Sequence, residues 1–166
     1  MTKNQISKSK SIIGFCIILG ITFSAAAIGG WASANAPGFY GILNKPSWAP
    51  PAAVFGPVWS VLYLLMAVAA WLVWKERRDR ENRRALSFYL LQLGLNALWT
   101  WVFFAWRLGG WALVEIGVLW VLILLTMIGF YRARPSAGLL LVPYLSWVTF
   151  AAALNAALWR LNPRLL

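Results

Sequence analysis

Long apolar runs separated by short polar or basic stretches make up most of this chain. Five runs can be read between the charged residues, each about 21 to 23 residues long, and an α-helix of that length crosses about 30 Å of hydrocarbon. We therefore predict an all-α integral membrane protein, a five transmembrane helix bundle that forms a single domain over residues 1–166. The expected spans are 11–31, 53–74, 85–106, 110–131 and 137–159.

The composition supports lipid as the natural solvent of the chain. Hydrophobic residues make up 61% of it and charged residues 11%, whereas a soluble domain averages about 25% charged residues. Four of the five runs end in Trp and the fourth ends in Tyr131, a pattern typical of an interfacial belt. The net charge of +11 would favour nucleic-acid binding in a soluble protein. Because the basic residues lie at the ends of apolar runs, we expect the lipid bilayer as the partner and no nucleic acid.

The distribution of basic residues predicts an orientation. Eleven of the 15 Lys and Arg residues fall on the side of the N-terminus and four on the other. The positive-inside rule then places the N-terminus in the cytoplasm and the C-terminus outside. The densest basic run, residues 75–84, is either a solvated turn that only sets this topology, which we favour, or a surface that binds anionic lipid headgroups. The first run also resembles a signal peptide, with a cleavage-like site at residues 32–34, but its length favours a membrane span.

The chain lacks residue types that many enzymes and metal sites use. It has no histidine and one cysteine, Cys16, which lies in an apolar run and is expected to pack. Without histidine, the commonest haem ligand and the commonest general base are missing, so we expect no catalytic residue, metal or cofactor. Glu115 is the only acidic residue outside the run 75–84. It either pairs with a base or caps a neighbouring backbone, which we favour, or has a functional role, as membrane carboxylates often do.

Two amide side chains lie one turn apart in the third span. Gln92 and Asn96 are spaced i, i+4, and Trp99 and Phe103 continue the same face. Amides inside a membrane usually hydrogen-bond across helices. We expect that structural role for Gln92. For Asn96, which lies beside aromatic rings, structural bonding and orientation of a ligand's carbonyl or propionate are equally open.

Bulky and small residues recur at helical spacing on two further faces. The members are Phe55, Trp59 and Tyr63 in the second span, and Trp147, Ala151 and Leu154 in the fifth. Pro143 is expected to bend the fifth helix above this face. Lipid gives aromatic rings no drive to gather away from it, so an inward cluster needs another reason. Ala151 leaves room that a bulky side chain would fill, and a flat apolar ligand would stack on the indoles.

A stiff loop joins the first two spans, because three prolines and Trp48 fall within residues 45–51. Further motifs follow in order: Gly56-Pro57-Val58-Trp59, Gln92-Leu93-Gly94-Leu95-Asn96, Gly110-Trp111-Ala112-Leu113-Val114-Glu115 and Val142-Pro143-Tyr144-Leu145-Ser146-Trp147. On these motifs, over roughly residues 12–162, the chain resembles the TspO/MBR family, the bacterial relatives of the mitochondrial translocator protein (peripheral-type benzodiazepine receptor).

The resemblance implies a compact five-helix bundle that forms a homodimer, with a ligand pocket under the first loop. Family members bind protoporphyrin IX and related tetrapyrroles, benzodiazepine-type and isoquinoline-carboxamide drugs, and in some cases sterol. Trp59 and Trp147 match the pocket indoles credited in some relatives with light-driven porphyrin breakdown. With the pocket and lid positions of the family added, the predicted ligand-binding residues are Tyr40, Trp48, Phe55, Trp59, Tyr63, Asn96, Trp99, Phe103, Trp111, Trp147, Ala151 and Leu154.

The chain departs from the family pattern at two places. Residues 154–160 keep the ends of the sterol-recognition pattern but carry Ala156 where animal relatives have Tyr, which argues against high sterol affinity. Trp101 stands in a stretch where relatives often carry a proline, so a straighter third helix is expected.

We expect a receptor-like membrane protein that binds protoporphyrin IX, or a related tetrapyrrole or other apolar molecule, in a Trp-lined pocket. Its purpose would be to sense, sequester or dispose of such molecules under stress, without being an enzyme. Two alternatives stay open: a transporter of porphyrin or another apolar metabolite, and an enzyme that degrades porphyrin in light through Trp59 and Trp147. A helical bundle favours the inner membrane of a bacterium, with the outer membrane as the alternative.

Overall fold

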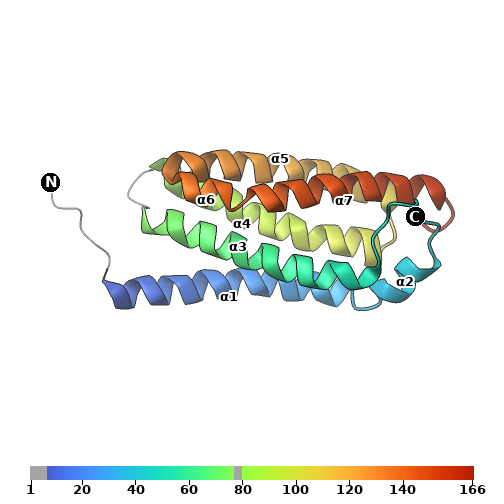
Figure 1. Ribbon diagram of the computed structural model, residues 1–166, viewed down its shortest axis with the longest axis horizontal. Coiled ribbons are helices and arrows are strands. Elements are labelled where there is room, and N and C mark those ends of the chain that lie inside the picture. The colour runs from blue at the N-terminus through green and yellow to red at the C-terminus, as the bar shows by residue number, and fades with distance from the viewer. Residues whose placement is uncertain (1–6, 77–79) are drawn as a thin grey trace.

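The computed structural model describes residues 7–76 and 80–166, and this part of the chain forms helices and turns but no strand. The long helices run side by side along one axis (Figure 1). The elements are α1 Lys8–Ala32, α2 Ala36–Ile42, the 3₁₀ turn η1 Ala52–Val54, α3 Phe55–Lys75, α4 Arg80–Thr100, the π-helical turn η2 Trp101–Ala105, α5 Gly109–Ala133, α6 Pro135–Leu139 and α7 Val142–Leu161. Lys3 and residues 77–79 of the basic run lie outside the described residues.

Five helical segments are long and apolar enough to cross a membrane, as the sequence predicts. They are Lys8–Ala32, Ala52–Lys75, Arg80–Ala105, Gly109–Ala133 and Pro135–Leu161. Most extend past the predicted ends, and the third begins at Arg80 where residue 85 was expected. Hydropathy marks where the hydrocarbon begins, whereas Arg and Glu favour helix and continue the hydrogen bonding into the aqueous boundary.

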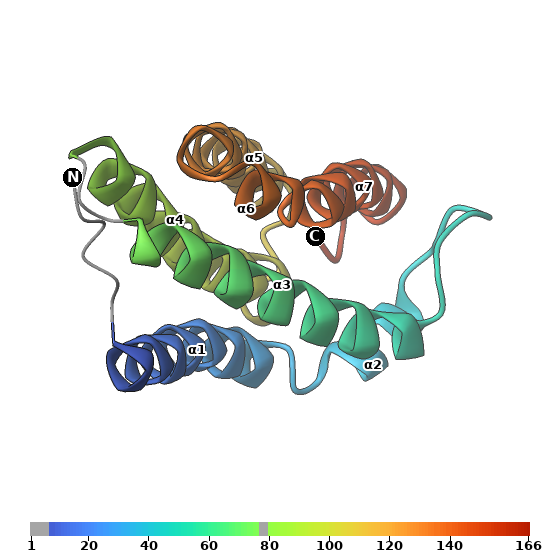
Figure 2. The ribbon, with the colours of Figure 1, turned by 60° about the vertical axis from the view of Figure 1, so that its left-hand side comes forward.

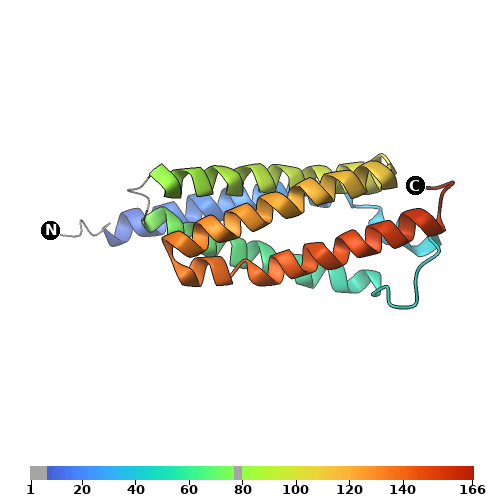
Figure 3. The same ribbon diagram turned by 90° about the horizontal axis from the view of Figure 1, so that it is seen from above.

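The long helices close a ring around an apolar core. α1 packs against α3 and α4, α4 against α5, and α5 against α6 and α7. α3 meets the last span mainly through α6 and only sparsely through α7. Figures 2 and 3 show the same arrangement from two further sides. The core includes Met66, Ile123 and Phe130, which are fully buried. The seam between α3 and α7 is therefore the loosest in the bundle.

The fifth span is interrupted just before Pro143, where the sequence predicts a bend within one helix. α6 ends at Leu139 and α7 begins at Val142, with Pro143 in its first turn. Proline has no backbone N–H to donate to the preceding turn, so it is accommodated at a helix start and not within one. α6 also lies close to the end of α5, since a Cβ built on Gly138 would lie 2.5 Å from Cβ and 2.7 Å from Cα of Tyr131.

The third span ends in a π-helical turn, Trp101–Ala105, and the straighter helix expected around Trp101 stays a prediction. Trp106 donates its backbone N–H to the Trp101 carbonyl at 2.8 Å, a bond across five residues. Arg107 then takes a φ of 57°, which is uncommon for a residue other than glycine. Its guanidinium lies 4.8 Å from the Phe39 ring centroid, so this turn contacts α2.

The prediction that Cys16 packs inside the bundle is wrong. Its side chain is exposed on α1. α1 packs on α3 and α4 along one side only, and the buried residues along it are Gly14, Thr22 and Gly29. In a membrane protein an apolar run signals contact with lipid as much as contact with the core, so hydropathy alone does not tell the two apart.

Candidate functional site

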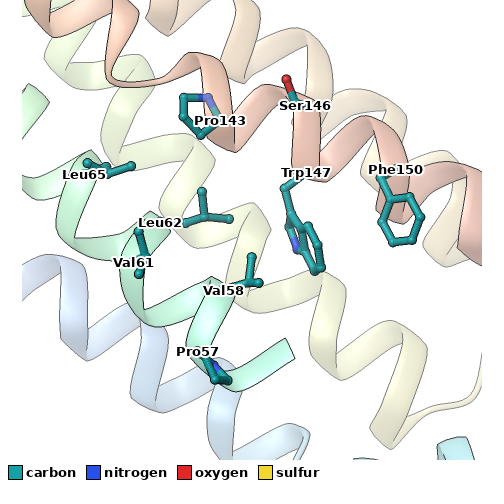
Figure 4. A pocket seen from close by; sticks show the side chains of 9 residues that line it. All are labelled: Pro57, Val58, Val61, Leu62, Leu65, Pro143, Ser146, Trp147 and Phe150. Carbon is teal, nitrogen blue, oxygen red and sulfur yellow. The ribbon is translucent and has the colours of Figure 1, made fainter. Parts of the chain in front are cut away.

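An open groove of about 560 Å³ lies along the loose seam between α3 and α7. Its walls are almost entirely apolar, and Figure 4 shows Trp147 of α7 directed toward Val58 and Leu62 of α3. The lining residues are Pro57, Val58, Val61, Leu62 and Leu65 from α3, and Pro143, Ser146, Trp147 and Phe150 from α7. A site of this size and character suits an apolar small molecule, because ligand pockets commonly measure about 300–1,000 Å³ and are mostly apolar.

Aromatic rings connect the groove to the loop between α1 and α3. Trp147 contacts Phe55 and Phe150, with ring centroids 5.9 and 5.4 Å apart. Phe150 in turn contacts Trp48 of the loop at 5.7 Å, and Phe55 contacts Tyr40 of α2 at 5.5 Å. Trp48 is 49% exposed, so about half of its indole stays free beside Phe150. The Pro- and Trp-rich loop thus reaches the α7 wall of the groove through the contact of Trp48 with Phe150.

Trp147, in the groove wall, has a buried hydrogen-bond donor that is left unsatisfied by the described part of the chain. Its indole Nε1 is buried and has no hydrogen-bond partner among the residues that the structure describes. An indole nitrogen can only donate, and a buried donor without an acceptor costs about 1–3 kcal/mol. A ligand that brings a carbonyl or carboxylate oxygen to this position would remove that cost.

The loop is fixed at its first half. Asn44 donates its backbone N–H to Asn162 Oδ1 at 2.8 Å, and Asn162 Nδ2 donates to the Asn44 carbonyl at 2.9 Å. Lys45 Nζ donates to three carbonyls at the end of α2, at 2.9 to 3.2 Å. The Tyr40 hydroxyl donates to the Pro50 carbonyl at 2.9 Å. Burial raises the pKa of the Tyr40 phenol, which keeps this donor protonated.

Comparison with known proteins identifies the family to which this chain belongs. A family model described as TspO/MBR family matches residues 13–160. The chain belongs to the TspO/MBR family.

Three relatives illustrate the breadth of this family. The chain is 39% identical to the tryptophan-rich protein TspO of Chlorobaculum tepidum over 163 residues, which are 96% of this chain and 98% of that protein. It is 41% identical to the human translocator protein over 126 residues, 75% of each chain. It is 43% identical to the tryptophan-rich sensory protein of Cereibacter sphaeroides over 124 residues, 75% and 77% of the two chains. With the five spans, these relatives support a receptor-like, multi-pass integral membrane protein.

Asn96, a predicted ligand-orienting residue of this TspO/MBR protein, lies in a buried network. It is 5% exposed. Its Oδ1 accepts from the Tyr63 hydroxyl at 2.6 Å, and its Nδ2 donates to the Tyr144 hydroxyl at 3.0 Å. Tyr144 donates to Gln92 Oε1 at 2.7 Å, and Gln92 Nε2 lies 3.8 Å from Met66 Sδ. The network joins three spans, so the geometry favours the structural reading for Asn96 as well as for Gln92.

The remaining predicted residues fall into three places. Trp59 packs on Tyr63 at 5.7 Å and faces Tyr144 at 6.2 Å, so it lies against the core beside the groove and does not line it. Ala151 also packs against this core. Tyr40, Trp99, Phe103 and Leu154 belong to a second apolar cluster near α2.

Within the second cluster, Trp99 stacks on Phe103 at 5.1 Å and donates its Nε1 to Asn155 Oδ1 at 3.3 Å. Trp111 is apart from both clusters, because its side chain is 69% exposed on α5. The structure therefore gathers Trp147, Phe55 and Trp48 at the groove, and leaves Trp111 on the outside of the bundle.

Sequence reasoning missed several groove residues, among them Val61, Ser146 and Phe150. None has a side chain that suggests binding by itself. The signal was their spacing: Pro143 and Phe150 lie four residues before and three residues after Trp147 and share its side of the helix, whereas Ser146 is its direct neighbour in the chain.

The structure contradicts the favoured prediction that Glu115 pairs with a base or caps a neighbouring backbone group. Both carboxyl oxygens are buried, and neither has a hydrogen-bond partner within residues 7–76 and 80–166. The carboxyl group therefore neither pairs with a described basic residue nor caps a described backbone group. The functional alternative for Glu115 stays a hypothesis.

Proposed function

We propose that this TspO/MBR protein binds a flat tetrapyrrole, protoporphyrin IX or a close relative, in the groove between α3 and α7. The carrying observation is the Trp147 indole, whose ring forms part of the groove wall and whose buried N–H has no described acceptor. A porphyrin offers an aromatic face to the indole and carboxylate oxygens to its N–H. Stacking on rigid rings costs little side-chain entropy, which favours such ligands.

The loop would contribute closure. Trp48 reaches the groove only through Phe150 and is half-exposed, so it can cover a ligand without leaving its anchored segment. The double hydrogen bond between Asn44 and Asn162 holds the base of that segment in place. In this proposal the protein senses, sequesters or disposes of photoreactive tetrapyrroles and works by binding, not by turnover.

We further propose that the protein resides in the inner membrane of a bacterium as a homodimer, with the N-terminus in the cytoplasm. The support for the orientation is that the start of α1, the end of α3, the start of α4 and the end of α5 lie at one end of the bundle (Figure 1). The basic residues of these four ends are therefore concentrated on one membrane face, in agreement with the positive-inside rule.

The test of the function is a titration in the dark. Purified protein in lipid nanodiscs is titrated with protoporphyrin IX while tryptophan fluorescence and the porphyrin absorption band are followed together. We expect saturable quenching with a shifted band, and linear quenching in empty nanodiscs. Quenching that stays linear with the protein present would refute tetrapyrrole binding. Repeating the saturated sample under light tests the enzymatic alternative, which requires porphyrin loss beyond one equivalent per protein.

A further inference from the structure

Away from the groove, three lysines gather where α1 begins and α3 ends. The two helices touch there, because Trp71 Nε1 donates to the Ser11 carbonyl at 3.0 Å. A Cβ on Gly14 would lie 2.5 Å from the ring of Trp74, so the absence of a side chain at Gly14 lets this indole pack directly on α1. Lys75 follows on α3, and its Nζ lies 4.0 Å from the centroid of the Trp71 ring.

Lys8 and Lys10 belong to the same corner by helix periodicity. Phe15 of α1 contacts Trp71 at 5.4 Å, and Lys8 lies two turns before it on the same side of the helix. Gly14 faces α3, and Lys10 lies four residues before it. Both lysines are exposed. The first turn of α1 therefore directs two cations toward the corner that already holds Lys75.

None of the three lysines forms an ion pair within the described part of the chain. The ion pair that the structure shows there joins Glu76 to Arg134 at 3.9 Å, and it involves none of the three. Lys45, at the other end of the bundle, differs because three backbone carbonyls surround its Nζ. Like charges repel in a medium of reduced dielectric, so an anion at this corner would be stabilised by all three.

The geometry points to a lipid as the source of that anion. Lys75 reaches back along α3 so that its Nζ lies over the face of the Trp71 indole, which places the cation at the level of an interfacial tryptophan. Ile12, one turn inward from Lys8, is 63% exposed and faces outward. A molecule in this corner thus meets cations at one end and apolar side chains at the other. A free phosphate would use only the cations.

We propose that this corner, formed by Lys8, Lys10, Lys75 and Trp71, is a specific binding site for the headgroup of an anionic phospholipid such as phosphatidylglycerol. The acyl chains would lie along the exposed apolar side of α1. The proposal is independent of the tetrapyrrole groove and goes beyond it, because it assigns a function to one part of the basic end of the bundle.

The experiment compares two triple variants that remove the same charge. The first is Lys8→Gln, Lys10→Gln and Lys75→Gln; the control is Arg83→Gln, Arg84→Gln and Arg132→Gln, from the same end of the bundle. Phosphatidylglycerol and phosphatidylcholine are titrated into each detergent-solubilised protein, and bound lipid is counted by native mass spectrometry. We expect a preference for phosphatidylglycerol in the wild type, a loss of affinity of at least about tenfold in the first variant, and less than about threefold in the control.

Three results would overturn the proposal. Equal losses in the two triple variants would mean diffuse surface charge and no site. Equal affinity of the wild type for the two lipids would mean that the site does not distinguish an anionic headgroup from a zwitterionic one. Displacement of the lipid by millimolar inorganic phosphate would mean a site for a soluble anion. If the first triple variant does not fold, as judged by circular dichroism, Lys75→Gln alone, compared with Arg132→Gln, gives the same contrast.

Discussion

Glu115 is a buried acidic residue whose hydrogen bonds are not satisfied by the described part of the chain. Its carboxyl oxygens are buried in α5 without a described hydrogen-bond partner, and an unpaired charge inside a membrane protein is costly. Other polar side chains at similar depth, such as Asn155, are bonded on both sides: Asn155 accepts from Trp99 and donates to the Gly109 carbonyl at 2.9 Å. A carboxyl group that is kept without such bonds does not contribute to stability through hydrogen bonding.

Glu115→Gln should therefore leave the melting temperature unchanged or raise it. The substitution keeps the shape of the side chain, breaks no described hydrogen bond and removes an acidic group whose charged form is costly to bury. Thermal unfolding in detergent, followed by circular dichroism, measures the effect, with Glu81→Gln at an exposed position of α4 as the control. A loss of stability of about 2 kcal/mol or more would show that Glu115 has a partner that this account does not contain.

At the scale of elements, Gly138 determines how the interrupted last span returns against the bundle. A Cβ there would meet the Tyr131 backbone, with its nitrogen at 2.8 Å. Backbone atoms cannot move aside as a flexible side chain does. Gly138→Ala should destabilise the protein by about 3 kcal/mol, whereas Gly117→Ala, with nothing within 4 Å of its Cβ, should be neutral or stabilising. Similar melting temperatures for the two variants would contradict the packing of α6 on α5.

The segment that contains α2 depends on the C-terminal end of α7. Asn162→Ala removes both hydrogen bonds to Asn44 and should cost about 1–3 kcal/mol of local stability. Hydrogen exchange measured by mass spectrometry should accelerate in peptides covering residues 36–48, while peptides from α4 and α5 stay protected. Asn35→Ala is the matched control, because Asn35 makes no capping bond to α2. Unchanged exchange in the Asn162 variant would show that the loop is held by other contacts.

For the whole molecule, the five spans follow from hydropathy because bilayer thickness sets their length. The break before Pro143 follows from the chemistry of proline. The exposure of Cys16 and Trp111 does not follow, since apolar side chains suit both lipid and core. The groove also escapes prediction, because it arises from the sparse contact of α3 with α7, which no local pattern encodes. The hydrogen-bond network around Asn96 is predicted only in part. Its spacing to Gln92 predicts a structural bond for Gln92 and leaves the role of Asn96 open.

The most direct test of the account asks whether the ligand lies against Trp147. Wild type, Trp147→Phe and Trp111→Phe are titrated with protoporphyrin IX in the dark, in nanodiscs of one lipid composition. Phe keeps the ring but cannot donate, so the account predicts affinity weaker by about fivefold to tenfold in Trp147→Phe. Trp111→Phe should match the wild type, since Trp111 lies outside the groove. Equal affinity of Trp147→Phe and wild type, or weakening only in Trp111→Phe, would contradict the groove as the tetrapyrrole site.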